Sequence, residues 1–214
     1  MLKRRLVLRL PLALPVALAA CASGDDLPLP PLVSGYRHLT PLRLNVLEVE
    51  IPDPAPGVVN VAASATLRPD TEMRRMGQER LVPVGTTGRA RFLMIRARFA
   101  RESLPRSGGL TSLFTGEPGE RFSCEMACRI EVMSAEGVRL GFAEAEARRT
   151  QTVADGASAA ARGRAAEDVV RLAMETLNVE FEFQIRRALR AWLVEGNQSL
   201  TPAPVQREDL VRPS

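Results

Sequence analysis

Hydrophobic and polar residues alternate along the middle of the chain and follow a helical period near its C-terminal end. Every second residue from Phe122 to Val132 is apolar, and most residues between them are polar or charged. A period of two over this length predicts a β-strand with one face in a core. The apolar positions of this strand are Phe122, Cys124, Met126, Cys128, Ile130 and Val132.

Between residues 157 and 193 the apolar residues recur at spacings of three and four, which predicts a long amphipathic helix. At a rise of about 1.5 Å per residue this helix is about 55 Å long. Four strands about 4.8 Å apart make a much narrower sheet. We therefore expect the alanine-rich start near Gly163 to kink or to overhang the sheet. The apolar stripe consists of Ala166, Val170, Ala173, Leu177, Phe181, Ile185, Ala188 and Trp192.

Weaker patterns supply three further elements. Residues 42–51 are rich in β-forming side chains and end at a proline, which predicts a first strand. Residues 69–81 begin with a proline and carry a sparse apolar face, which predicts a short helix. Residues 89–104 alternate again and predict a second strand. Its core face is expected to hold Leu93, Ile95, Ala97 and Phe99.

A tight turn is predicted at residues 134–137, where Gly137 can take a positive φ. Residues 138–150 then pair back as a fourth strand, with Leu140 and Phe142 on the core face and Gly141 at a bulge. The order strand, helix, three strands, long helix predicts an α+β domain. Its four-stranded antiparallel sheet carries both helices on one face (β-α-β-β-β-α).

The spacing of Cys124 and Cys128 suggests two hypotheses, a disulfide and a metal site. Four residues along a strand separate their Cα atoms by about 13 Å, and a disulfide needs less than about 7 Å. Both thiols also occupy core positions of the alternating strand, where a free cysteine acts as a small hydrophobic side chain. We therefore predict two buried, reduced thiols.

The N-terminal segment has the layout of a secretory signal. Four basic residues lie among the first nine, an apolar run follows, and Ala19 and Ala20 precede Cys21. The apolar run is too short to span a bilayer as a mature helix. Two interpretations of Cys21 stay open, an acylated N-terminus and a spare thiol behind an ordinary signal. The Arg4-Arg5 pair also leaves the twin-arginine export route open.

The run Leu18-Ala19-Ala20-Cys21 resembles the lipobox of bacterial lipoproteins. The resemblance implies cleavage before Cys21 and acylation of its sulfur and its new amino group, so that lipid anchors the protein to a membrane. In that family an aspartate after the cysteine retains the protein at the inner membrane. Ala22 therefore implies the periplasmic face of the outer membrane of a Gram-negative bacterium.

With the expected order of elements, the lipobox makes the chain similar to small uncharacterised envelope lipoproteins of proteobacteria. More distantly, it resembles the lipopolysaccharide-assembly lipoprotein and the auxiliary lipoproteins of lipid-transporting ABC systems. The resulting organisation is a signal peptide at 1–20, a lipidated cysteine and proline-rich tether at 21–35, a single α+β domain at 36–196 and a disordered tail at 197–214.

The charge of the chain belongs to its signal. Four of the 29 basic residues lie in residues 1–20, which contain no acid, and the other 25 are balanced by 25 acidic residues. A near-neutral mature chain excludes the basic surface typical of nucleic-acid binding. His38 is the only histidine, it is expected at the surface, and no nucleophile, phosphate-binding or zinc motif occurs. We expect no catalytic residues, no metal and no cofactor, and hence not an enzyme.

Residues 108–119 form a glycine-rich loop that carries Leu110, Leu113 and Phe114. Apolar side chains on such a loop predict a contact with a membrane or a partner. The alternative is that Leu113 and Phe114 fold back over the sheet edge. Two functions follow. The first is a non-enzymatic accessory lipoprotein that binds an outer-membrane or transport protein, and the second is a carrier that hands on lipid or lipopolysaccharide.

Overall fold

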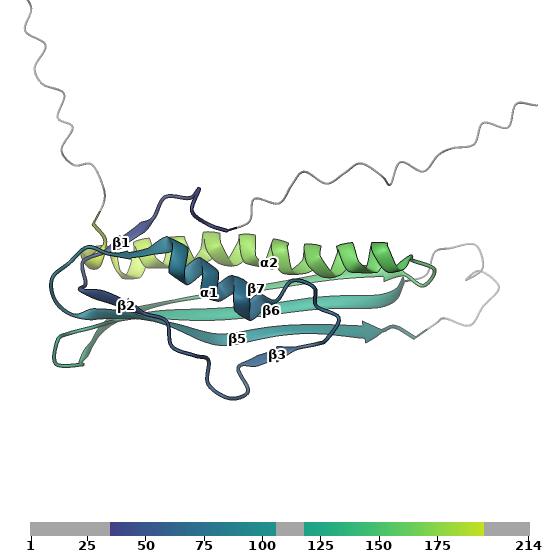
Figure 1. Ribbon diagram of the computed structural model, residues 1–214, viewed down its shortest axis with the longest axis horizontal. Coiled ribbons are helices and arrows are strands. Elements are labelled where there is room, and N and C mark those ends of the chain that lie inside the picture. Colours follow the sequence, from purple (N-terminus) through teal and green to yellow (C-terminus); the bar gives the residue numbers. More distant parts are fainter. Residues whose placement is uncertain (1–34, 106–117, 195–214) are drawn as a thin grey trace, which may run out of the picture. The chain divides into compact units, whose positions relative to one another are not determined.

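Three long antiparallel strands form the centre of the fold (Figure 1). They are β5 (Arg89–Ser103), β6 (Pro118–Met133) and β7 (Arg139–Ala154), which pair in chain order. The short strands β2 (Glu48–Glu50) and β3 (Val59–Val61) both pair with β5 in parallel. The computed structural model describes residues 35–105 and 118–194, all within the unit that begins at Gly35.

The predicted α+β class with a long C-terminal helix is confirmed, but the predicted sheet is wrong in two respects. The sheet has five strands and is mixed, because β2 and β3 run parallel to β5. The single strand expected at residues 42–51 is also divided. Its first part, β1 (Leu42–Leu44), pairs in parallel with β4 (Leu81–Pro83) in a separate two-stranded sheet.

The division of that strand has a local cause. The Val46 amide donates to the Leu44 carbonyl oxygen at 2.8 Å, which turns the chain sharply. The Asn45 amide donates to the Trp192 carbonyl oxygen at 2.7 Å, so the turn is held by the C-terminal end of the domain. Most of residues 42–51 favour a strand, and Asn45 at the turn is the only residue among them typical of turns. The turn is held by a contact with the far end of the sequence, which no local pattern reveals.

Two helices cover the same face of the sheet, as predicted. They are α1 (Pro69–Arg80) and α2 (Ala159–Ala188), and a 3₁₀ turn, η2 (Arg190–Trp192), follows α2. The Phe92 ring of β5 meets the Phe181 ring of α2 edge-on, with centroids 5.5 Å apart. A Cβ added at Gly77 of α1 would lie 3.1 Å from the same Phe92 ring, so the glycine permits this close approach.

The expected kink or overhang of the long helix is wrong, because α2 runs along the strands and not across them (Figure 1). It returns antiparallel to β7, from Arg162 beside Glu120 to Leu189 beside Gly141. A 16-residue strand is about 53 Å long, and the 30-residue helix is about 45 Å long. The two lengths match, so the strand supports the whole helix.

The faces of the long strands agree with the predicted pattern on β6 and differ on β5. All six alternating apolar residues of β6 are 1% exposed or less. On β5 the pairing slips between Met94 and Arg96, so Ile95 is the extra residue of a bulge. The buried positions are therefore Phe92 and Met94 before the bulge and Ala97 and Phe99 after it, and the expected core positions Leu93 and Ile95 are wrong.

On β7 the predicted core face is reversed. Leu140 and Phe142 are exposed, and Ala143, Ala145 and Ala147 are buried in their place. The helix α2 packs most closely on β7, so small side chains are needed beneath it. The irregularity predicted at Gly141 is present, since the pairing slips between Arg139 and Gly141.

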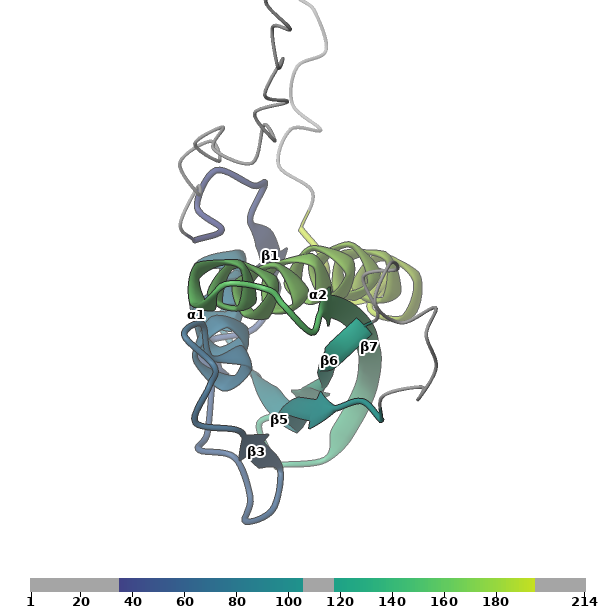
Figure 2. The same ribbon diagram turned by 90° about the vertical axis from the view of Figure 1, so that its right-hand side faces the viewer.

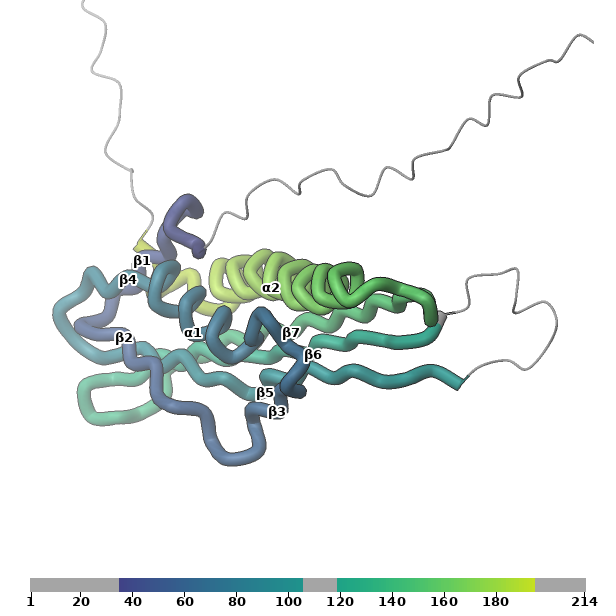
Figure 3. The backbone as a smooth tube through the Cα atoms, turned by 45° about the vertical axis from the view of Figure 1, so that its right-hand side comes forward, coloured from purple at the N-terminus to yellow at the C-terminus, as the bar shows by residue number. Residues whose placement is uncertain are grey.

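The turn of residues 134–137 is confirmed, with Gly137 at a φ of 84°. The apolar stripe of α2 is confirmed from Ala166 to Ile185, whereas Ala188 is exposed and Leu189 is buried in its place. Figure 3 shows the β6–β7 hairpin at one end of the long strands, and the ends of β5 and β6 that flank residues 106–117 at the other.

Candidate functional site

The candidate loop residues Leu110, Leu113 and Phe114 lie outside the described residues, and so does Cys21. The structure does describe the base from which the loop leaves the sheet. The Leu104 amide donates to the Gly119 carbonyl oxygen at 2.9 Å, which joins the two ends of the loop. The two strand ends that flank the loop are therefore joined at this end of the sheet, which we call the loop end.

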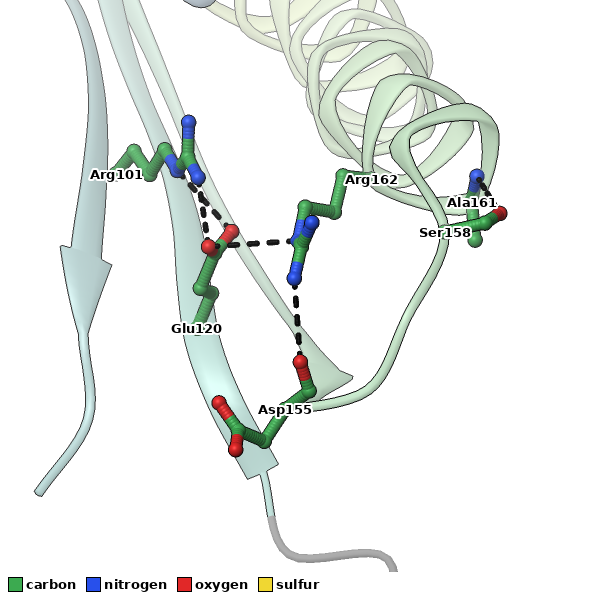
Figure 4. A network of polar contacts seen from close by, with 6 residues as sticks. All are labelled: Arg101, Glu120, Asp155, Ser158, Ala161 and Arg162. Carbon is green, nitrogen blue, oxygen red and sulfur yellow. Dashed lines mark hydrogen bonds and ion pairs between the residues drawn. The ribbon is translucent and has the colours of Figure 1, made fainter. Parts of the chain in front are cut away.

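A network of charged side chains fixes the loop end (Figure 4). Arg101 of β5 donates through Nε and Nη2 to the two carboxylate oxygens of Glu120, at 3.0 and 2.6 Å. Arg162 of α2 places its Nε 3.4 Å from the same carboxylate and donates through Nη2 to the Asp155 carbonyl oxygen at 3.1 Å. One carboxylate thus connects β5, β6 and the first turns of α2.

The network keeps Glu120 ionised. The bonds from Arg101 hold the pKa of the Glu120 carboxyl below its ordinary value, with Arg162 adding to the effect against partial burial. A carboxylate held in this state accepts hydrogen bonds and is poorly suited to proton transfer near neutral pH. The pair Glu120–Arg162 spans 42 positions of sequence, so no local pattern reveals it. The one part of this region that the sequence could indicate is the start of α2. A serine is a typical helix N-cap, and the Ser158 hydroxyl accepts a hydrogen bond from the Ala161 amide at 3.1 Å.

The two core cysteines are free and buried, as predicted. Burial raises the pKa of the Cys124 thiol to about 12, and burial also raises the pKa of Cys128 above its ordinary value. Neutral thiols are weak nucleophiles and weak metal ligands. Within residues 35–105 and 118–194 no group of three or more histidine, cysteine or acidic residues is placed to hold a metal ion. His38 is exposed, also as predicted.

The face of the sheet opposite the helices, which we call the open face, carries a fixed aromatic side chain. Two guanidinium groups lie over the ring of Phe142 on β7, that of Arg129 at 5.5 Å and that of Arg139 at 5.2 Å from the ring centroid. The almost buried Glu131 carboxylate accepts a hydrogen bond from Arg139 at 3.1 Å and lies 3.6 Å from Arg129. Phe142 is therefore held in place although it lies outside the core.

A second exposed apolar feature lies on α2. Leu172, Val179 and Phe183 are 47%, 68% and 56% exposed, and their spacing of seven and four places them along one side of the helix. We call these three residues the outer stripe. The predicted apolar stripe of the helix does not include these three residues, because they lie off its spacing of three and four.

No helix in the described part of the chain is both long enough and apolar enough to cross a bilayer. The chain matches no protein-family model and no curated protein sequence.

Solved structures that are similar to part of the chain include two lipoproteins. The first, a "putative lipoprotein" from Caulobacter crescentus CB15, is 14% identical with a TM-score of 0.32, covering 65% of this chain and 90% of that one. The second, a minor lipoprotein from Acinetobacter baumannii, is 10% identical with a TM-score of 0.28, covering 72% of this chain and 99% of that one. At such low TM-scores neither similarity assigns a fold or a function to this chain.

Proposed function

We propose that the protein is a non-enzymatic lipoprotein, anchored by lipid at Cys21 on the periplasmic face of the outer membrane, whose domain binds a protein partner of the envelope. The observation that carries the proposal is the run Leu18-Ala19-Ala20-Cys21, placed directly behind a basic and then an apolar segment. Acyl chains on the cysteine attach the domain to a bilayer, and two or more chains make that attachment stable.

The packing of the domain favours partner binding over lipid carriage. A lipid carrier needs an apolar space between its sheet and helix for the acyl chains. Here the two layers are joined by side chains that are 1% exposed or less, among them Phe92, Met126, Leu177 and Phe181. The alanines of β7 bring α2 close to the sheet in addition. The apolar side chains that a partner could contact lie on the surface, in the outer stripe of α2 and at Phe142 on the open face.

The lipid anchor is tested by replacing its attachment point. Cys21→Ser should abolish incorporation of a labelled palmitate analogue and leave the protein uncleaved or released from the membrane. Cys124→Ala, which removes a thiol that stays in the core, is the matched control and should be labelled like the wild type. A free Cys21 thiol in the mature wild-type protein, measured by mass spectrometry, contradicts the proposal.

The membrane to which the protein is sorted is tested at the following position. Ala22→Asp should move the acylated protein from the outer-membrane fraction to the inner-membrane fraction of a density gradient. If the wild type already sediments with the inner membrane, the proposed location is wrong. This outcome would leave the lipid anchor itself unaffected, so the two parts of the proposal are separable.

Partner binding is tested by crosslinking in native membranes. A photoreactive residue placed at Phe114 should give a defined protein adduct, and one placed at Val138, at the hairpin end of the sheet, should not. Extraction of the protein with stoichiometric bound lipid or lipopolysaccharide, detected by native mass spectrometry and without a protein adduct, would instead support the carrier function.

A further inference from the structure

The outer edge of β7 is the least protected backbone of the described sheet. In residues 35–105 and 118–194 no strand pairs with it, because β7 ends the order β2-β5-β6-β7. It runs for 16 residues without a proline. The opposite edge is covered by the short strands β2 and β3, with Pro52, Pro54 and Pro56 between them. The β7 edge can therefore accept another strand.

The charges of β7 specify which strand fits. Its residues alternate, with the alanines and Arg149 on the side of α2 and Glu144, Glu146 and Arg148 on the open face. Along the open face Glu144 and Glu146 come first and Arg148 follows. An acidic first half and a basic second half complement themselves when two copies of the strand run antiparallel, because each acidic half then lies beside a basic one.

Among the registers centred on residues 145–149, only one avoids opposing like charges, and registers centred farther out shorten the paired region. In a continuous sheet, residues that lie directly opposite each other on the two β7 strands must point to the same face of the sheet. Centring the pair on Ala145 or Glu146 places glutamates opposite each other, and centring it on Arg148 or Arg149 places arginines opposite each other. Centring it on Ala147 places Glu146 of each copy opposite Arg148 of the other, and the two strands then pair over almost their full length.

The outer stripe of α2 lies mainly on the side of the helix away from the sheet, about 120–180° around the helix from the buried Leu177 and Phe181, and the Thr176 side lies nearer the β7 edge. Arg149 of β7 donates through Nη2 to the Thr176 hydroxyl at 2.7 Å, so this side of α2 faces the β7 edge. Thr176 lies one turn from Leu172 and from Val179. On the other side of α2, Glu182 pairs with Arg80 of α1. In the end view of Figure 2, α1 lies to one side of α2 and β7 to the other.

The stripe is also level with the predicted two-fold axis. Gly141 lies beside Leu189, and Val153 pairs with Glu120, which lies beside Arg162. Ala147 is midway between Gly141 and Val153, so the axis passes about midway along α2, near Thr176, between Leu172 and Val179. The helix lies over β7 and, to a lesser extent, β6. Two β7 strands about 4.8 Å apart then place the two helix axes within about 10 Å, the spacing of packed helices.

We propose that a second copy of this chain binds at the β7 edge, forming a two-fold symmetric dimer with a continuous sheet centred on Ala147. The two Glu146–Arg148 pairs set the register, and the two α2 helices lie side by side above the junction. The same surface patch is used by both copies, so the contact closes on itself.

The mature full-length protein in detergent should sediment with twice the protomer mass. Oxidation of Ala147→Cys should give a disulfide-linked dimer, because residues directly opposite in an antiparallel pair have Cα atoms about 4.5–5.5 Å apart. Ala145→Cys, on the same face and equally buried, is the matched control and should stay uncrosslinked, since its two copies would lie about 13 Å apart along the strands. A monomeric wild type, or equal crosslinking of both variants, overturns the proposal.

Charge exchange tests the register without a cysteine. Glu146→Arg and Arg148→Glu should each weaken the dimer by about tenfold, because each creates two like-charged pairs. The double exchange should restore most of the affinity. If the single changes leave the dissociation constant unchanged while their melting temperatures match the wild type, the register is wrong. A monomer whose outward β7 amides resist hydrogen exchange would show that another segment of the chain covers the edge, which also overturns the dimer.

Discussion

At the scale of single residues, one buried ion pair connects the two helices. The Arg80 side chain at the end of α1 is 1% exposed and donates through Nη2 to Glu182 of α2. Glu182 also accepts from Arg186, one turn along the same helix, at 2.9 Å. Partial burial acts to raise the pKa of the Glu182 carboxyl, but the bonds from Arg80 and Arg186 outweigh it and hold the pKa below its ordinary value.

Removing the charge of Glu182 leaves a buried guanidinium without its counter-ion. Glu182→Gln should therefore lower the free energy of unfolding by about 2 kcal/mol. Because the folded pKa is lowered, the contribution is present above the ordinary glutamate pKa of about 4.3 and is lost as the pH falls through the folded pKa. Urea unfolding of both proteins should converge in acid. Glu175→Gln, a matched change on the same helix, should have little effect at any pH.

Cys124 and Cys128 should react slowly with iodoacetamide in the folded protein at pH 8. Their raised pKa values leave almost no thiolate, and their side chains are 1% exposed or less. In denaturant both should be labelled rapidly. A peptide map that shows fast labelling of the folded protein, or a disulfide between the two, would contradict the assignment of residues 118–133 to one strand.

At the scale of elements, the sheet and α2 stabilise each other through side chains of unequal size. Large residues of β5 and β6 fill the space below the helix, and alanines of β7 allow the helix to approach. The bulge at Ile95 shifts the core-facing positions within β5, and the pairing slip near Leu140 lies just before the buried alanines of β7. The helix therefore meets a continuous apolar surface although β5 does not alternate regularly.

Truncations on α2 test this arrangement. Leu177→Ala or Phe181→Ala should lower the free energy of unfolding by about 2–5 kcal/mol, because both side chains are fully buried and their removal leaves a cavity. Val179→Ala on the same helix is 68% exposed and should change it by less than about 0.5 kcal/mol. Chemical denaturation measures all three. Similar small effects at all three positions would mean that this side of α2 does not face the core.

At the scale of the whole molecule, candidate contact surfaces lie at different places on one domain. The loop end carries the segment 106–117, and the β7 edge lies along the side of the sheet. The network around Glu120 fixes the strand ends that hold the loop. A change in the loop should therefore leave the β7 edge unaffected, so the two surfaces can be tested separately.

Replacing Leu113 and Phe114 with serine should leave the melting temperature nearly unchanged and weaken association with the partner or membrane. The expectation is that these apolar side chains contribute to binding and not to the core. Val138→Ser with Leu140→Ser, at the hairpin end and 60% and 51% exposed, is the matched control. Unfolding of the loop variant would place its side chains in the core. A folded variant with unchanged crosslinking would equally remove the loop as the binding site.

The sequence by itself determined the elements whose signal is local and periodic. It specified the six core residues of β6, the turn at Gly137, the short helix α1 and the apolar stripe of α2, because period and turn chemistry are properties of neighbouring residues. The lipobox run is also a property of neighbouring residues, so the lipid anchor is predicted from the sequence alone.

Tertiary structure alone decided features that depend on distant residues. The split of residues 42–51 involves the hydrogen bond that the Asn45 amide donates to Trp192, and the bulge at Ile95 depends on pairing with β6. The exposure of Phe142 depends on how closely α2 approaches β7. The β7 edge is also a property of strand order. The self-complementary charges of β7 can be read from the sequence. They predict pairing only once the structure places the strand at the edge of the sheet, because a second strand binds to backbone groups that have no strand beside them.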